Sequence, residues 1–217
     1  MPYGVPRKAN FRARTDRQAP CFPIEDWHEP LVGERDGYRI IEKEAGNGMF
    51  HPISPREIAS RLADLPDWTI AELDVVQLSD VTRKKRRFPC YGLQWGTAIY
   101  LYPMCETMVE IYCAPPGPKL LNETKMYGGK WFEDNGEKTW MLQWSEKTLR
   151  DFYLNNVLIH ELGHLNDDRN SSFDSRERYA DWFAIEFGYR KTRNRKNSNR
   201  NPGSRHSNHR RRHHGGK

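Results

Sequence analysis

The sequence predicts an α+β fold: an N-terminal helix, a small and mostly antiparallel twisted sheet, and two consecutive helices near the carboxyl end. Capping residues in front of apolar runs with helical spacing indicate the helices. Short runs of alternating apolar and polar residues, bounded by turn residues, indicate the strands. The 217 residues are 36% hydrophobic and 12% aromatic, which is enough for one folded core.

The first helix is expected to begin after Ser54 and to end before Pro66. Ser54 and Glu57 have the spacing of a capping box, and Pro55 suits the first turn of a helix. Apolar or alternating runs before and after this helix predict strands. The four strand candidates are Tyr38–Ile41, Glu72–Leu78, Thr97–Tyr102 and Met108–Cys113.

A β-hairpin is predicted further along the chain. Its strands are Lys130–Asp134 and Glu137–Trp144, and Asn135-Gly136 between them is typical of a two-residue hairpin turn. A run of five basic residues, Arg83–Arg87, lies between two of the earlier strands. It is interpreted as a solvated loop or, alternatively, as a phosphate-binding loop.

The net charge of +6 is unevenly distributed along the chain. Residues 1–20 hold five Lys and Arg against one acid, and residues 189–217 hold eleven and no acid. The remaining 19 basic and 28 acidic residues give the middle of the chain a charge of about −9. We therefore expect a disordered basic N-terminus over 1–20, a folded domain over 21–189 and a disordered Arg-, Asn- and His-rich tail over 190–217. Such a tail would bind nucleic acid without base specificity.

Composition also excludes some classes of protein. No segment approaches the ~20 consecutive apolar residues of a membrane helix, and the first residues lack the apolar centre of a signal peptide. We expect no membrane partner. Cys21, Cys90, Cys105 and Cys113 form no CxxC pair, and Cys113 continues an apolar alternation, so it is expected to be a small core residue. A reducing, cytoplasmic location is favoured.

A long helix is predicted from its cap at Ser145 to about Leu165, and it contains the sequence His-Glu-Leu-Gly-His. His160 and His164 lie one turn apart on one face of that helix. Two imidazoles at this spacing can bind one zinc ion. Glu161 is rotated by about 100° from His160, so it can reach a zinc-activated water instead of binding the metal. The apolar stripe that holds the helix down is Leu154, Leu158, Leu162 and Leu165.

The following helix, expected from Asp174 to Gly188, carries the candidate third ligand. Glu177 and Asp181 share one face, and small alanines beside them allow close approach to the preceding helix. Glu177 is the preferred ligand, and Asp181 would accept a hydrogen bond from a ligating histidine. Alternatively, both acids only favour the positive end of a helix. The rival ligands are Asp167, Asp168, Asp174 and Glu186.

These motifs together resemble the gluzincin group of zinc metallopeptidases, which includes thermolysin, the minigluzincins and the peptidases that cleave phage-type repressors. The resemblance covers about residues 145–188 and rests on HELGH followed by E-x-x-A-D-x-F-A, in which the fixed positions are Glu177, Ala180, Asp181, Phe183 and Ala184. It implies a zincin-like fold, His160, His164 and Glu177 as Zn²⁺ ligands, Glu161 as the catalytic acid and base, and Asp181 as the partner of a ligating histidine.

The chain also departs from that family. The separation between His164 and Glu177 is short compared with thermolysin, and Arg176 stands where thermolysin relatives have Asn. No residue after Gly188 can be assigned to stabilise an oxyanion.

The expected function is hydrolysis of a peptide or protein substrate by a zinc-activated water, with Glu161 as general base. The substrate would lie extended along an edge strand. Three strands are candidates for this role: Thr97–Tyr102, Met108–Cys113 and Glu137–Trp144. The alternative is a non-proteolytic, zincin-like, nucleic-acid-associated protein that binds through its basic tail.

Overall fold

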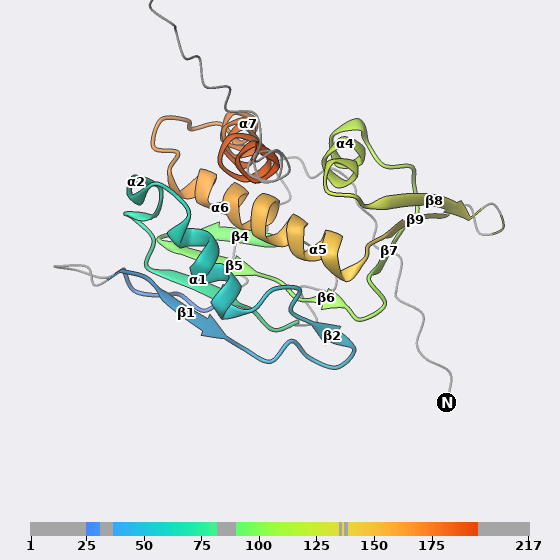
Figure 1. The fold of residues 1–217 in the computed structure, drawn as a ribbon, viewed down its shortest axis with the longest axis horizontal. Coiled ribbons are helices and arrows are strands. Elements are labelled where there is room, and N and C mark those ends of the chain that lie inside the picture. Colours follow the sequence, from blue (N-terminus) through green and yellow to red (C-terminus); the bar gives the residue numbers. More distant parts are fainter. Residues whose placement is uncertain (1–24, 31–36, 82–89, 135, 137–138, 195–217) are drawn as a thin grey trace, which may run out of the picture.

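The computed structural model describes residues 25–30, 37–81, 90–134, 136 and 139–194. The basic run Arg83–Arg87, the N-terminus and nearly all of the basic tail lie outside the described residues. Within the described part, helices and small sheets form the α+β arrangement that the sequence predicts (Figure 1). None of the helices there combines the length and apolar character needed to span a bilayer.

The largest sheet has four strands in the order β1-β3-β5-β4. They are β1 (Arg39–Glu42), β3 (Val75–Leu78), β5 (Ala98–Leu101) and β4 (Gly92–Trp95). β1, β3 and β5 are parallel, and only β4 is antiparallel to its neighbour. The expected mostly antiparallel arrangement is therefore wrong for this sheet. Parallel strands need a crossover, and α1 (Pro55–Ala63) and α2 (Asp67–Ile70) supply it between β1 and β3.

The start of α1 is confirmed in detail. Ser54 Oγ accepts a hydrogen bond from the Glu57 N–H at 3.3 Å, and Glu57 Oε2 accepts one from the Ser54 N–H at 2.9 Å. Pro55 occupies the first turn, and the helix ends before Pro66. Ile58 and Leu62 are fully buried, so this amphipathic helix is anchored to the main core.

Both faces of the central strands are buried, although the alternation in β5 predicts a half-buried strand. Helices cover one face, and residues 25–30 contact the other. His28 stacks on Tyr100 with ring centroids 5.8 Å apart, and the Tyr100 hydroxyl donates to the Asp26 carbonyl at 2.9 Å. The second layer comes from a distant part of the sequence, which is why alternation alone does not reveal it.

A second sheet has the order β7-β9-β8 and is antiparallel. Its strands are β7 (Val109–Tyr112), β8 (Lys130–Asp134) and β9 (Thr139–Gln143), and a short pair joins β2 (Met49–Phe50) to β6 (Met104–Cys105). The predicted hairpin is present as β8–β9. Its predicted two-residue turn is wrong, because Asp134 pairs with Thr139 whereas an Asn135-Gly136 turn would pair it with Glu137.

The expectation for Cys113 is also wrong, since this residue is exposed. The inward face of β7 carries Glu110 and Tyr112 instead. The Glu110 carboxylate accepts hydrogen bonds from the hydroxyls of Tyr91 and Tyr112, at 2.8 and 3.1 Å, and from the Trp144 indole at 3.0 Å. These three hydrogen-bond donors offset the cost of burying the Glu110 carboxylate. Assigning apolar residues to the inside and polar residues to the outside therefore predicts the wrong buried face for β7.

Between β7 and β8 lies α4 (Pro118–Met126), which the sequence analysis does not predict. It begins directly after a run rich in Pro and Gly that is typical of a loop. Pro118 occupies the first turn, where a proline is well tolerated. The position of α4 matters because two of its side chains reach the candidate functional site.

The long helix is continuous and consists of α5 (Glu146–Phe152), a π-helical segment η2 (Tyr153–Val157) and α6 (Leu158–Leu165). Its predicted cap is confirmed: Ser145 Oγ accepts a hydrogen bond from the Thr148 N–H at 3.3 Å. Leu158 and Leu162, from the predicted apolar stripe, are fully buried. Figure 1 shows α6 between the sheet and α7.

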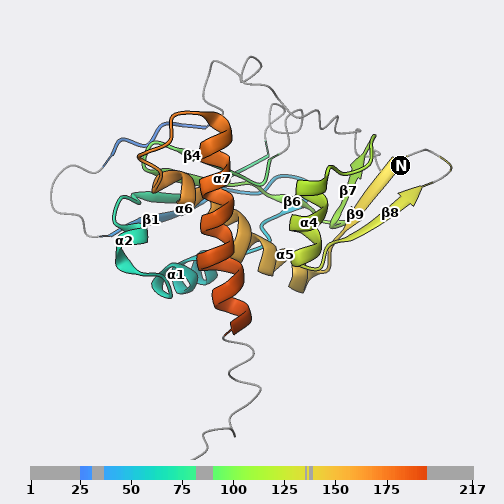
Figure 2. The same cartoon turned by 90° about the horizontal axis from the view of Figure 1, so that it is seen from above.

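The last helix begins and ends differently from the prediction. It comprises α7 (Phe173–Phe183) and the π-helical segment η3 (Ala184–Arg190), and it continues through 191–194. Its cap is Ser172, not Asp174. Gly188 does not end the helix. A Cβ at Gly188 would lie 1.9 Å from the Asn155 carbonyl oxygen, so this glycine permits close contact with the long helix, which α7 crosses (Figure 2).

Candidate metal centre

The centre exists because α6 and α7 pack very closely. A Cβ at Gly163 would lie 2.8 Å from Ala180 Cα and 3.0 Å from Phe183 Cβ, so only glycine fits without a shift. Ala180 is itself fully buried. The small residues expected to permit close approach therefore lie at the contact between the helices. This contact brings Glu177 on α7 close to His160 and His164 on α6.

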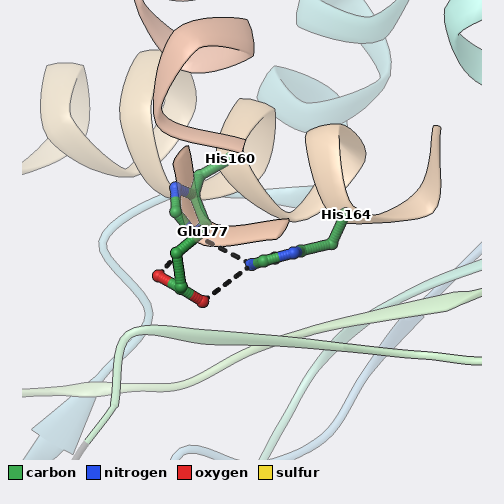
Figure 3. A group of neighbouring side chains, drawn as sticks. All are labelled: His160, His164 and Glu177. Carbon is green, nitrogen blue, oxygen red and sulfur yellow. Dashed lines mark hydrogen bonds and ion pairs between the residues drawn. The ribbon is translucent and has the colours of Figure 1, made fainter. Parts of the chain in front are cut away.

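His160, His164 and Glu177 form one cluster, and one ligand atom from each lies within 4.8 Å of the others (Figure 3). The two histidine Nε2 atoms are 3.1 Å apart. Glu177 Oε1 is 3.2 Å from His164 Nε2, and Glu177 Oε2 is 3.8 Å from His160 Nε2. Two nitrogen donors and a carboxylate, all partly buried, could hold one metal ion.

Asp181 lies behind His160, on the side away from the shared donor atoms. Its Oδ1 is 3.3 Å from His160 Nδ1, which leaves His160 Nε2 directed at His164 and Glu177. Lys119 from α4 is 2.7 Å from Asp181 Oδ2 and 3.5 Å from Glu177 Oε2. Its ammonium group therefore compensates part of the negative charge that two neighbouring carboxylates would otherwise leave on α7.

The pKa shifts in the cluster follow from burial and from these contacts. Burial alone would lower the pKa of His160, but its hydrogen bond with Asp181 and the charges of Glu161 and Glu177 outweigh that effect and raise it. Burial alone would raise the pKa of Glu177 and of Asp181. Their histidine partners, together with Lys119, outweigh it and lower both pKa values. The metal-free cluster thus carries charges that attract one another.

Glu161 lies on α6 beside the cluster and contacts the sheet. It is 8% exposed, and the backbone N–H of Gln94 donates a hydrogen bond to its carboxylate. Burial raises the pKa of Glu161, against the opposing influence of the two histidines. A carboxylate with a raised pKa beside a candidate metal site is suited to accept and release a proton.

Strand β4 passes directly beside Glu161. A Cβ at Gly92 would lie 2.7 Å from Glu161 Oε1, so glycine is required for this approach. The Tyr91 carbonyl accepts a hydrogen bond from the Tyr102 N–H, at 2.9 Å. Because backbone groups alternate in direction along an antiparallel strand, those of Gly92 and Gln94 face away from the neighbouring strand. Within the described residues, β4 is an outer strand of its sheet.

None of the three strands that the sequence analysis offers as a substrate edge is β4. Thr97–Tyr102 contains β5, which is an inner strand between β3 and β4. Met108–Cys113 and Glu137–Trp144 contain β7 and β9, which belong to the other sheet. The edge strand that contacts Glu161 is only four residues long and contains Gly and Gln, so its composition gives little strand signal.

The rival ligands lie outside the cluster of potential ligand atoms found among the described residues. Asp167 Oδ1 accepts hydrogen bonds from the backbone and side chain of Asn170, at 3.1 and 2.8 Å. Glu186 pairs with Arg190 one turn later, and Asp168 and Asp174 are exposed.

Several residues near the centre were not predicted from the sequence. Lys119 and Glu123 come from the unpredicted helix α4, and Asn156 Nδ2 donates a hydrogen bond to Glu123 Oε1. Burial raises the pKa of Glu123, while Asn156 and the charge of His160 oppose that shift. The proline at the start of α4 is the one local signal that could have revealed this helix.

Comparisons with protein-family models, with curated proteins and with solved structures find no match to this chain. Inferences about its function therefore rest on the geometry of the centre and on the sequence motifs.

Proposed function

We propose that the protein is a zinc metallopeptidase of the gluzincin type. In this proposal His160, His164 and Glu177 bind Zn²⁺, Glu161 is the general base, and Asp181 orients His160. The observation that carries the proposal is the cluster of two histidines and one carboxylate. Two further carboxylates, those of Glu161 and Asp181, lie beside this cluster. The order of helix, sheet, metal-site helix and ligand helix is consistent with a zincin-like domain.

The donor set favours zinc over the harder cations. Imidazole nitrogen is a preferred zinc ligand, whereas Mg²⁺ and Ca²⁺ prefer oxygen. Tetrahedral zinc with bonds of about 2.0–2.1 Å has donor atoms about 3.3 Å apart. The distances of 3.1, 3.2 and 3.8 Å between donor atoms are close to that value. Three protein ligands would leave one position for a reacting group.

The zinc ion would supply a Lewis acid that polarises a peptide carbonyl and lowers the pKa of water. Glu161 would accept the proton of the attacking water and deliver it to the leaving amine. The raised pKa of Glu161 suits both steps, because its protonated form is stable enough to hold the proton between the two transfers. Asp181 would accept a hydrogen bond from the His160 Nδ1–H. This would hold the tautomer in which Nε2 carries no proton and can bind the metal.

The substrate would bind as an extended peptide along the open edge of β4. The outward-facing backbone groups of Gly92 and the carbonyl of Gln94 could form main-chain hydrogen bonds with it. This edge is the part of the sheet that contacts Glu161, so a peptide there would have its backbone next to the general base. Main-chain bonds of this kind give affinity with little sequence preference.

The alternative is a zincin-like protein that binds nucleic acid through its basic tail without proteolysis. Glu161 favours the enzyme. A binding protein has no chemical use for a carboxylate at this position, and burial of Glu161 disfavours its ionised form. The tail remains a proposed second contact for nucleic acid, because it carries eleven basic residues and no acid.

A cytoplasmic location belongs to the same proposal. Cys105 and Cys113 are free cysteines. Free thiols persist in reducing compartments, whereas secreted domains tend to pair theirs.

The proposal is tested by the substitution Glu161→Gln. The amide cannot accept the proton of water, so hydrolysis of a pool of unstructured peptides should fall at least ~10²–10⁴-fold. Zinc content should stay at the wild-type level. Glu146→Gln, an exposed change at the start of the same long helix, is the matched control. Wild-type hydrolysis by Glu161→Gln would show that Glu161 is not the base.

A further inference from the structure

We propose that Arg176 binds a carboxylate of the substrate next to the scissile bond. The carboxylate is either an acidic side chain or the free C-terminus of the peptide. This inference deepens the proposed peptidase function and rests on it. It assigns a substrate class, peptides with a negative charge beside the cleaved bond, to a site that otherwise contacts only backbone.

The position of Arg176 gives it access to that part of a bound peptide. It lies on α7 immediately before Glu177, and its Nη2 is 3.4 Å from Gln94 Oε1 on β4. The backbone N–H of the same Gln94 is bonded to the Glu161 carboxylate. The guanidinium group is therefore one side chain away from the general base and at the open edge along which the peptide would lie.

Among the described residues, Arg176 has no carboxylate partner, which a half-buried cation needs. Its Nε is buried and has no hydrogen-bond partner, and no described carboxylate lies within ion-pair distance of it. Its weak contact with Gln94 is to a neutral amide. Two other cations in the described part have carboxylate partners: Lys119 is 2.7 Å from Asp181, and Arg193 is 2.8 Å from Asp151.

A carboxylate is the group that satisfies this guanidinium best. Its two oxygens match the planar fork of N–H donors and can accept two parallel hydrogen bonds. Burial of an unpaired charge is costly, and a substrate carboxylate would remove that cost at the moment of binding. A peptide carbonyl could accept only part of the donor set and carries no compensating charge.

The test compares wild-type protein with Arg176→Gln and with Arg178→Gln. Arg178 is the matched control, because it lies two residues later on the same helix, is exposed and bonds only to Asp174 and Ser175 in the described part. The probes are three octapeptide pools with otherwise randomised, acid-free positions. The first pool has a central Glu and blocked ends. The second has a central Gln and blocked ends. The third has a central Gln and a free C-terminus. The basic tail is present in every protein, so its attraction for acidic peptides cancels.

Two readouts are taken. Mass spectrometry gives the cleavage rate and the residues that flank each cut. Equilibrium dialysis gives retention of each pool by the same three proteins in a Glu161→Gln background, where turnover is suppressed. Wild type and Arg178→Gln should prefer one of the carboxylate pools over the blocked Gln pool by roughly 10–100-fold, the range for a charge-assisted hydrogen bond. Arg176→Gln should lose that preference, whereas Arg178→Gln should keep it.

The pool that is preferred identifies the source of the carboxylate, side chain or C-terminus. The inference would be overturned, even if hydrolysis is observed, by either of two results. One is equal cleavage and retention of all three pools by the wild type, and the other is an undiminished preference for a carboxylate pool in Arg176→Gln. If no pool is cleaved, the peptidase proposal fails, and dialysis still decides about Arg176. An Arg176-dependent preference in retention then supports carboxylate binding, and its absence overturns it.

Discussion

Substitution of Gly92 by Ala should impair catalysis while leaving the metal ligands intact. The added Cβ would lie 2.8 Å from Glu161 Cγ and 3.0 Å from Val157 Cγ1, whereas carbon atoms in ordinary contact are about 3.5–4.0 Å apart. Glu161 must therefore move by roughly 0.7 Å or more away from β4. Misplacement of a reacting group by about 1 Å can cost roughly 100-fold in rate. Overpacking of this kind costs about 1–3 kcal/mol of stability.

The assay measures hydrolysis of the peptide pool, zinc content and thermal unfolding of the same preparation. We expect a rate lower by roughly 100-fold, unchanged zinc and a melting temperature lower by several degrees, from about 2–4 °C per kcal/mol at this chain length. Gly117→Ala is the control, because a Cβ there meets nothing within 4 Å and its φ is −65°. A folded Gly92→Ala protein with the wild-type rate would refute the role assigned to the contact between β4 and Glu161.

Three further predictions concern the fold and the tail. Gly188→Ala should lower the free energy of unfolding by about 3 kcal/mol or more in urea titrations, because its Cβ would clash with the Asn155 carbonyl; a loss below about 0.5 kcal/mol would contradict this packing. Burial raises the pKa of Glu110, so its ionised form destabilises the fold. The stability of wild type relative to Glu110→Gln should therefore rise as pH falls from neutral towards 4.5, the ordinary pKa of a glutamate, and a difference that is flat or falls over that range would contradict the sign. Deletion of residues 195–217 should abolish binding to DNA that otherwise weakens roughly 10³–10⁵-fold between about 50 and 200 mM salt, and equal affinity with and without the tail would move the binding site elsewhere.

Features that depend on neighbouring residues could be predicted from the sequence. The caps at Ser54 and Ser145 are local hydrogen bonds between residues three apart, so their spacing is visible in the chain. The pair of histidines is equally local, because one helical turn brings them together. Glu177 required one further inference, that small residues let two consecutive helices approach, and Gly163 against Ala180 provides that contact.

Features that depend on distant segments could not be predicted in this way. Gly188 has the composition of a helix end, but its absent side chain accommodates a carbonyl from another helix. The polar side chain of Glu110 points inward because donors from three other positions meet it. The parallel order of the main sheet depends on a crossover, and strand alternation carries no information about direction. The edge strand β4 and helix α4 complete the candidate centre from segments with weak local signals.

The most direct measurement of the central claim is the zinc content of a protein that ends at residue 194, which retains the described helix and removes the His-rich tail. After mild dialysis, we expect about one zinc ion per chain in this protein and in Glu186→Ala, a control on the same helix whose carboxylate pairs with Arg190. Glu177→Ala should lose the stoichiometric zinc while remaining folded. Absence of zinc from the unsubstituted protein, or equal zinc in Glu177→Ala, would contradict the proposed metal centre.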